Sequence, residues 1–63
     1  MYTFYKENKN SSGVVIERYE YYIDNQKCYE EYRSFVNDKF YKRRITLKEM
    51  LYLTQNAKKE KRR

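Results

Sequence analysis

The sequence predicts an α+β fold, a small single domain in which an N-terminal antiparallel β-hairpin is followed by two α-helices. Three observations support this class. The only glycine lies in a polar loop at 8–13, between two segments rich in aromatic and β-branched residues. The apolar spacing changes from two toward three and four after Lys27. Thr46 and Glu49 then have the spacing of a helix-capping box. We therefore expect the hairpin in 1–23, the first helix in 24–44, and the second helix with a basic tail in 45–63.

The hairpin is expected to pair residues of about 2–7 with residues of about 14–23, on either side of the polar loop. In the second strand, Tyr19, Tyr21 and Ile23 share one face, since side chains alternate along a strand. Several apolar residues of the same segment also fit helical spacing. A helix over 14–23 is therefore the open alternative.

An amphipathic first helix is predicted over about 28–42, because apolar residues recur there at intervals of three and four. These residues are Tyr29, Tyr32, Val36 and Phe40, with Phe35 beside them. The segment begins with acidic residues and ends with basic ones, which complements the helix dipole. Cys28 falls near the start of this helix, where it is either a half-buried filler or a reactive thiol.

The second helix is expected over about 46–60. Thr46 and Glu49 form the capping box, and Ile45 and Met50 stand at the positions of a hydrophobic staple. No glycine or proline interrupts the sequence after Thr46, so the helix should continue into the basic tail. The predicted core consists of Tyr19, Tyr21, Tyr32, Phe35, Val36, Met50 and Leu51.

Charge is divided unevenly along the chain. Residues 1–38 carry five basic and seven acidic groups, a net charge of −2, whereas residues 39–63 carry ten basic and two acidic groups, a net charge of +8. The whole net charge of +6 therefore comes from the C-terminal part. Such a chain presents a cationic end to something acidic, which could be nucleic acid, an acidic protein surface or an anionic membrane surface.

The residue types exclude most catalytic chemistry. The chain has no histidine and one cysteine, and it contains neither a glycine-rich phosphate loop nor a nucleophile with an evident base. No intrachain disulfide can form, and no spacing of carboxylates suggests a metal site. We therefore expect a protein that is not an enzyme and that has no cofactor and no metal.

Location and origin follow from composition alone. No apolar run approaches the roughly 18 residues that span a bilayer, and the N-terminus lacks the pattern of a signal peptide. A cytoplasmic protein without a membrane span is expected, in keeping with its unpaired cysteine. Lys, Asn, Tyr, Ile and Phe make up 29 of the 63 residues. All are encoded by AT-rich codons, which suggests a phage or mobile element of a low-GC bacterium.

Three functions remain open. The first is an inhibitor or modulator that binds an acidic or nucleic-acid-handling host protein complex. The second is a direct DNA- or RNA-binding accessory protein, and the third is a structural oligomer, with a homodimer favoured by the small core. The two basic clusters would lie on the order of 20 Å apart at the ends of the second helix. The predicted partner-binding residues are Lys42, Arg43, Arg44, Lys58, Lys59, Lys61, Arg62 and Arg63, with Tyr41 and Tyr52 as aromatic anchors.

Overall fold

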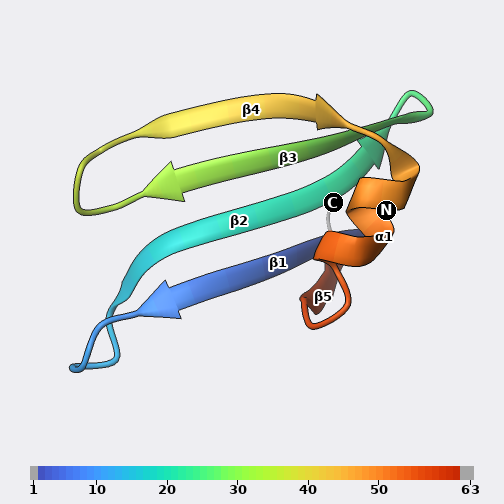
Figure 1. Cartoon of the computed structure of the whole chain (residues 1–63). Helices are drawn as coiled ribbons and strands as arrows, with labels where there is room; N and C mark the ends of the chain where they lie inside the picture. Colours follow the sequence, from blue (N-terminus) through green and yellow to red (C-terminus); the bar gives the residue numbers. More distant parts are fainter. Residues whose placement is uncertain (1, 62–63) are drawn as a thin grey trace.

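The chain folds as one antiparallel sheet of five strands with a single short helix (Figure 1). The structure, a computed structural model, describes residues 2–61. Its elements in chain order are β1 (Tyr2–Lys9), β2 (Val15–Asp24), β3 (Lys27–Ser34), β4 (Phe40–Ile45), α1 (Leu47–Leu53) and β5 (Lys58–Lys61). The strands lie side by side in the order β4-β3-β2-β1-β5, so β4 and β5 form the two edges. The prediction of a hairpin followed by two helices is wrong.

The N-terminal hairpin is confirmed. Strands β1 and β2 pair antiparallel, with Phe4 opposite Tyr21 and Lys6 opposite Tyr19. Gly13 has a positive φ of 80° in the connecting loop, a conformation that glycine adopts without steric cost. Residues 15–24 form a strand, so the helical alternative for 14–23 is wrong.

The predicted first helix, in 24–44, is replaced by β3 and β4. Asn25 and Gln26 both have positive φ values, 51° and 65°, as required for the two central residues of a tight hairpin turn. A two-residue turn brings the next segment back antiparallel to β2, and Asp24 pairs with Lys27 at its base. Strand β4 then pairs antiparallel with β3. Cys28 consequently lies buried within a strand instead of at a helix start.

The start of the second helix is confirmed, but its length is wrong. The Thr46 side chain accepts the Glu49 backbone N–H at 3.1 Å, and the Glu49 carboxylate accepts the Thr46 backbone N–H at 3.3 Å. The helix ends after seven residues at Leu53. The basic tail forms β5, which pairs with β1. In a helix, Lys58 and Lys61 would be neighbours and repel each other.

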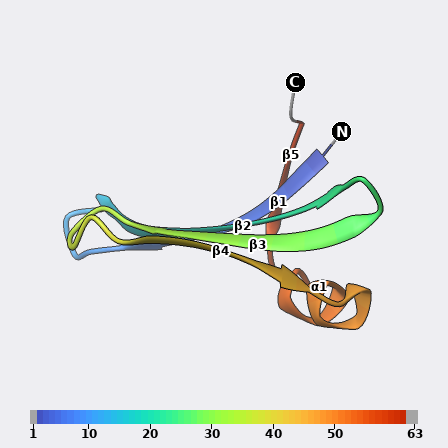
Figure 2. The same ribbon diagram turned by 90° about the horizontal axis from the view of Figure 1, so that it is seen from above.

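The helix α1 packs against one face of the sheet, at the end where β4 stops, and we call this the helix face (Figure 2). No helix of residues 2–61 packs against the other face, which we call the open face. The core lies on the helix face and consists of Tyr21, Cys28, Ile45 and Met50, all at most 7% exposed. Tyr21 and Met50 were predicted there. The other predicted core residues differ: Tyr19 and Tyr32 are half-buried, while Phe35, Val36 and Leu51 are 55%, 69% and 63% exposed.

Helical spacing predicted Phe35 and Val36 in the core, but their segment is not helical. Phe35 and Val36 lie in the connection between β3 and β4, after the last residue of β3. Leu51 follows the buried Met50 on α1 and points away from the sheet because successive helical residues are 100° apart.

Candidate partner-binding edge

The two basic clusters of the sequence lie on opposite edges of the sheet. Lys42, Arg43 and Arg44 belong to β4, whereas Lys58, Lys59 and Lys61 belong to β5. Three strands separate the two edges. The expectation that both clusters flank one helix is therefore wrong. Arg62 and Arg63 lie outside the described residues.

Strand β4 combines cations with exposed aromatic side chains. Phe40 is 53% exposed and Tyr41 is 43% exposed, and every residue of β4 except Ile45 is exposed. Because side chains alternate, Tyr41 and Arg43 belong to the helix face, and Phe40, Lys42 and Arg44 belong to the open face. Lys39 precedes the strand and adds a fourth cation at this edge.

Arg43 already forms an ion pair within the protein. Its Nε donates to the Glu30 carboxylate at 2.6 Å, and the Tyr41 hydroxyl donates to the same oxygen at 3.1 Å. Burial by itself raises the pKa of Glu30, but the Arg43 guanidinium and the Tyr21 and Tyr41 hydroxyls outweigh burial and hold this pKa below its ordinary value. The Arg43 side chain nevertheless remains 51% exposed, so one side of it is still accessible to a partner.

Lys42 and Arg44 differ in how they are held. The Lys42 ammonium lies over the rings of Tyr29 and Tyr22, at 4.8 and 5.7 Å from their centroids. The Tyr22 hydroxyl and nearby Glu31 raise the pKa of Lys42. Arg44 makes no ion pair, side-chain hydrogen bond or ring contact within residues 2–61. Its guanidinium is the cation of β4 that is most available to an anion.

The backbone of β4 also has unpaired groups on its outer edge. A hydrogen bond from the Ser34 N–H to the Lys39 carbonyl, 2.8 Å, closes the β3–β4 hairpin. Hydrogen-bonded and non-hydrogen-bonded pairs alternate along an antiparallel ladder. The register therefore turns the N–H and C=O groups of every second residue of β4 away from β3. These residues are Phe40, Lys42 and Arg44.

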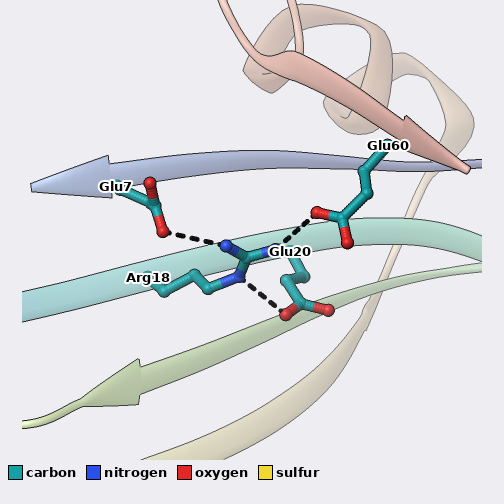
Figure 3. A network of polar contacts seen from close by, with 4 residues as sticks. All are labelled: Glu7, Arg18, Glu20 and Glu60. Atoms are coloured by element: carbon teal, nitrogen blue, oxygen red, sulfur yellow. Dashed lines mark hydrogen bonds and ion pairs between the residues drawn. The ribbon is translucent and has the colours of Figure 1, made fainter. Parts of the chain in front are cut away.

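The edge at β5 has a different character, because it is tied into the sheet by an ion-pair network on the open face (Figure 3). The Arg18 guanidinium donates to Glu7 and Glu20 at 2.9 Å and to Glu60 at 3.0 Å. It also lies 4.2 Å from the centroid of the Tyr5 ring. One arginine of β2 thus links β1, β2 and β5. These ion pairs attach β5 to the sheet in addition to its backbone pairing with β1.

Carboxylates accompany the tyrosines on both faces of the sheet. The Tyr32 hydroxyl donates to Glu17 at 2.6 Å, on the helix face. On the open face, the Tyr22 hydroxyl donates to Glu31. The rings of Tyr19, Tyr32 and Tyr41 form a row across three strands, with centroids 4.9 and 5.1 Å apart. A polyanion lying across either face would meet glutamates, whereas one following the β4 edge would meet cations.

The predicted aromatic anchors are also separated. Tyr41 lies on β4 among the basic groups, as expected. Tyr52 lies on α1 and is 71% exposed, on neither edge strand. The sequence analysis missed Phe40 as a surface residue, and it missed Arg18 and Glu30, which decide how the cations are used. A glutamate at a core-facing position of a strand is the signal that could have identified Glu30.

The described residues offer no group of three or more metal-ligating side chains. The helix α1 is too short to cross a membrane, and residues 2–61 contain no other helix. Comparison with protein-family models, curated proteins and solved structures found no match.

Proposed function

We propose that this chain is a small non-enzymatic binding protein that holds an acidic segment of a partner protein along β4. The observation that supports this proposal most strongly is the combination found on that edge. Arg44 and Lys39 have no anionic partner among the described residues, Phe40 is exposed beside them, and the outer backbone groups are unpaired. Arginine and aromatic side chains, phenylalanine included, are enriched in protein–protein interfaces.

The partner that we propose is a host protein complex that handles nucleic acids, with this chain as its inhibitor or modulator. Such a role for a phage or mobile-element protein is supported by the basic net charge of +6 and by a composition drawn largely from AT-rich codons. A chain of 63 residues with no histidine is suited to act by occupying a surface.

Direct binding of DNA or RNA has less support. Nucleic acid is bound through many phosphate contacts, usually along a continuous basic surface. Here the β4 and β5 cations are separated by three strands, and glutamates such as Glu20 and Glu31 lie on the open face between them. These carboxylates would repel a phosphate backbone that crossed the sheet.

Assembly into an oligomer through the sheet edges also has less support. Pairing β4 of one copy with β4 of another would bring lysine and arginine side chains opposite one another. Like charges directly opposite destabilise a strand pair, and charged edge strands commonly prevent such pairing. The same applies to β5, where three of four residues are lysine.

Affinity capture from a low-GC bacterial lysate tests the proposal. The baits are the wild-type protein, a Lys42→Glu/Arg44→Glu variant of β4, and a Lys58→Glu/Lys61→Glu variant of β5 with the same change in charge. We expect the wild-type and β5-variant baits to retain the same protein after nuclease treatment, and the β4 variant to lose it. Loss of all captured material on nuclease treatment would instead identify nucleic acid as the ligand.

A further inference from the structure

The outer edge of β4 offers a hydrogen-bonding ladder as well as charge. The N–H and C=O groups of Phe40, Lys42 and Arg44 face away from β3, and no strand of residues 2–61 pairs with them. A strand edge of this kind can accept an extended peptide through main-chain hydrogen bonds, with the side chains of β4 setting its specificity. This inference rests on the proposed function and concerns how the acidic partner is held.

We propose that the partner segment adds to the sheet as a strand antiparallel to β4, with carboxylates at alternate positions. The residues of β4 whose backbone groups face outward are also those whose side chains lie on the open face. A partner residue directly opposite Lys42 or Arg44 would therefore form a hydrogen-bonded pair with it. Its side chain would lie about 5 Å away, Cβ to Cβ, on the same face.

The proposed alternation of carboxylates in the partner follows from the contacts that the three cations of β4 already make within the protein. On the open face, Arg44 has no anion among the described residues, and Lys42 is held mainly by tyrosine rings. On the helix face, Arg43 already donates to Glu30. The partner consequently gains most from carboxylates on the open face alone, which means at every second residue of an extended strand.

The next position along the open face suits an apolar side chain. Phe40 lies two residues before Lys42 and is 53% exposed. With Phe35 it forms the apolar part of the lining of a hollow of about 370 Å³, whose other walls carry charged side chains such as Glu31 and Arg33. The matching partner sequence therefore carries two carboxylates at alternate positions, followed two residues later by an apolar residue, because the strands run in opposite directions.

A second copy of this chain fits the same edge poorly. Its own β4 would place cations opposite cations, and the carboxylates of β3 are already inside the sheet. A nucleic acid could use the cations but not the ladder, since it has no peptide backbone. These differences allow the backbone contribution to be tested separately from the charge.

The test is a ¹⁵N NMR titration of the full chain with an eight-residue peptide of alternating Thr and Glu. Two further peptides carry one N-methyl group, either on a central Glu or on the adjacent Thr. In the proposed pairing the Glu residues lie opposite Lys42 and Arg44, and their N–H groups donate to β4. We expect N-methyl-Glu to weaken binding about tenfold or more, and N-methyl-Thr to change it less than about threefold.

The chemical shifts of the backbone amide protons of β4 provide an independent test of strand addition. On addition of the unmodified peptide, the amide protons of Lys42 and Arg44 should shift downfield more than those of Tyr41 and Arg43, which face β3. On the protein side, Lys42→Pro removes an outward N–H and the charge, whereas Lys42→Ala removes only the charge. Lys42→Pro should therefore weaken peptide binding more than Lys42→Ala does.

The outcomes distinguish failure of strand addition from failure of the proposed function. Equal binding by the two methylated peptides would overturn strand addition while leaving charge-based binding at β4 intact. Failure of the unmodified peptide to bind would also overturn strand addition. The proposed function fails separately, if the β4 charge variant still captures the same protein from the lysate as the wild-type bait does.

Discussion

The Arg43 guanidinium, on the exposed edge strand, donates to the buried Glu30 carboxylate of β3 at 2.6 Å. This pair joins a residue that belongs to the basic cluster of the sequence to one that belongs to its acidic part. Part of the charge imbalance along the chain is thus neutralised across the β3–β4 ladder. The cations most available to a partner are therefore the neighbours of Arg43, chiefly Arg44.

Replacement of Glu30 by glutamine should destabilise the fold. Glutamine keeps the size of the side chain but loses the charged hydrogen bond from Arg43, and charged hydrogen bonds contribute about 1.5–3 kcal/mol. We expect the free energy of unfolding, measured by urea titration, to fall by about that amount. Asp24→Asn is the matched control, because it also replaces a carboxylate with an amide, but Asp24 is exposed and makes no ion pair or side-chain hydrogen bond within residues 2–61. An equal loss in both variants would contradict the role of the Glu30 pair.

The same pair should give the stability a pH dependence. The pKa of Glu30 is held below its ordinary value of 4.5 in the folded protein. The ionised carboxylate therefore stabilises the fold above about pH 4.5, and this stabilisation is lost as the pH falls through the lowered folded pKa. Urea titrations between pH 7 and pH 3 should show a smaller loss in Glu30→Gln than in the wild-type protein. Parallel curves for the two proteins would disprove this assignment.

Truncation to alanine should destabilise the fold much more at Met50 than at Leu51. Met50 is 4% exposed in the core, and Met-to-Ala changes in cores cost about 2–5 kcal/mol. Leu51 lies on the outer side of α1, where a change to alanine should stay within about 0.5 kcal/mol. Thermal unfolding of Met50→Ala and Leu51→Ala measures the difference. A large loss of stability in Leu51→Ala would show that Leu51 belongs to the core.

The Arg18 network should control how firmly β5 is attached. Arg18→Gln removes the ion pairs to Glu7, Glu20 and Glu60, so we expect faster amide hydrogen exchange in β5 and in the β1 residues that pair with it. Exchange in β3 and β4 should change little. Arg33→Gln is the control, since Arg33 lies over the Phe40 ring and makes no ion pair within residues 2–61. Unchanged exchange in β5 would show that backbone pairing alone holds the strand.

Local signals predicted the hairpin and the helix start. Both features are encoded within a few residues: a polar loop with Gly13 between β-prone segments, and the reciprocal bonds of Thr46 and Glu49. Asp24 and Asn25 are turn-forming residues, but they do not by themselves specify the two-residue turn at Asn25 and Gln26. It lacks the glycine that usually marks a tight hairpin, so the sequence did not show that a third strand must follow.

The misassigned segments depend on contacts far apart in sequence. The core-facing positions of β3 include Glu30 and Ser34, which conceal the alternation typical of a half-buried strand. Tyr29 and Tyr32 have helical spacing, but Tyr29 lies on the open face of the sheet and Tyr32 on the helix face. Strand β5 forms because β1 offers a free edge, which overrides the helix propensity of the tail. For the same reason the sequence alone did not show that the two basic clusters lie on opposite edges of the sheet.

The central claim is that the partner is a protein bound at β4. Replacement of Phe40 or of Tyr52 with photoreactive benzoylphenylalanine, followed by irradiation in the lysate and nuclease treatment, tests this claim directly. Both residues are exposed aromatics, but only Phe40 lies on β4. We predict a nuclease-resistant protein adduct from position 40 and none from position 52. An adduct formed only from position 52, or one from position 40 that nuclease removes, would contradict this claim.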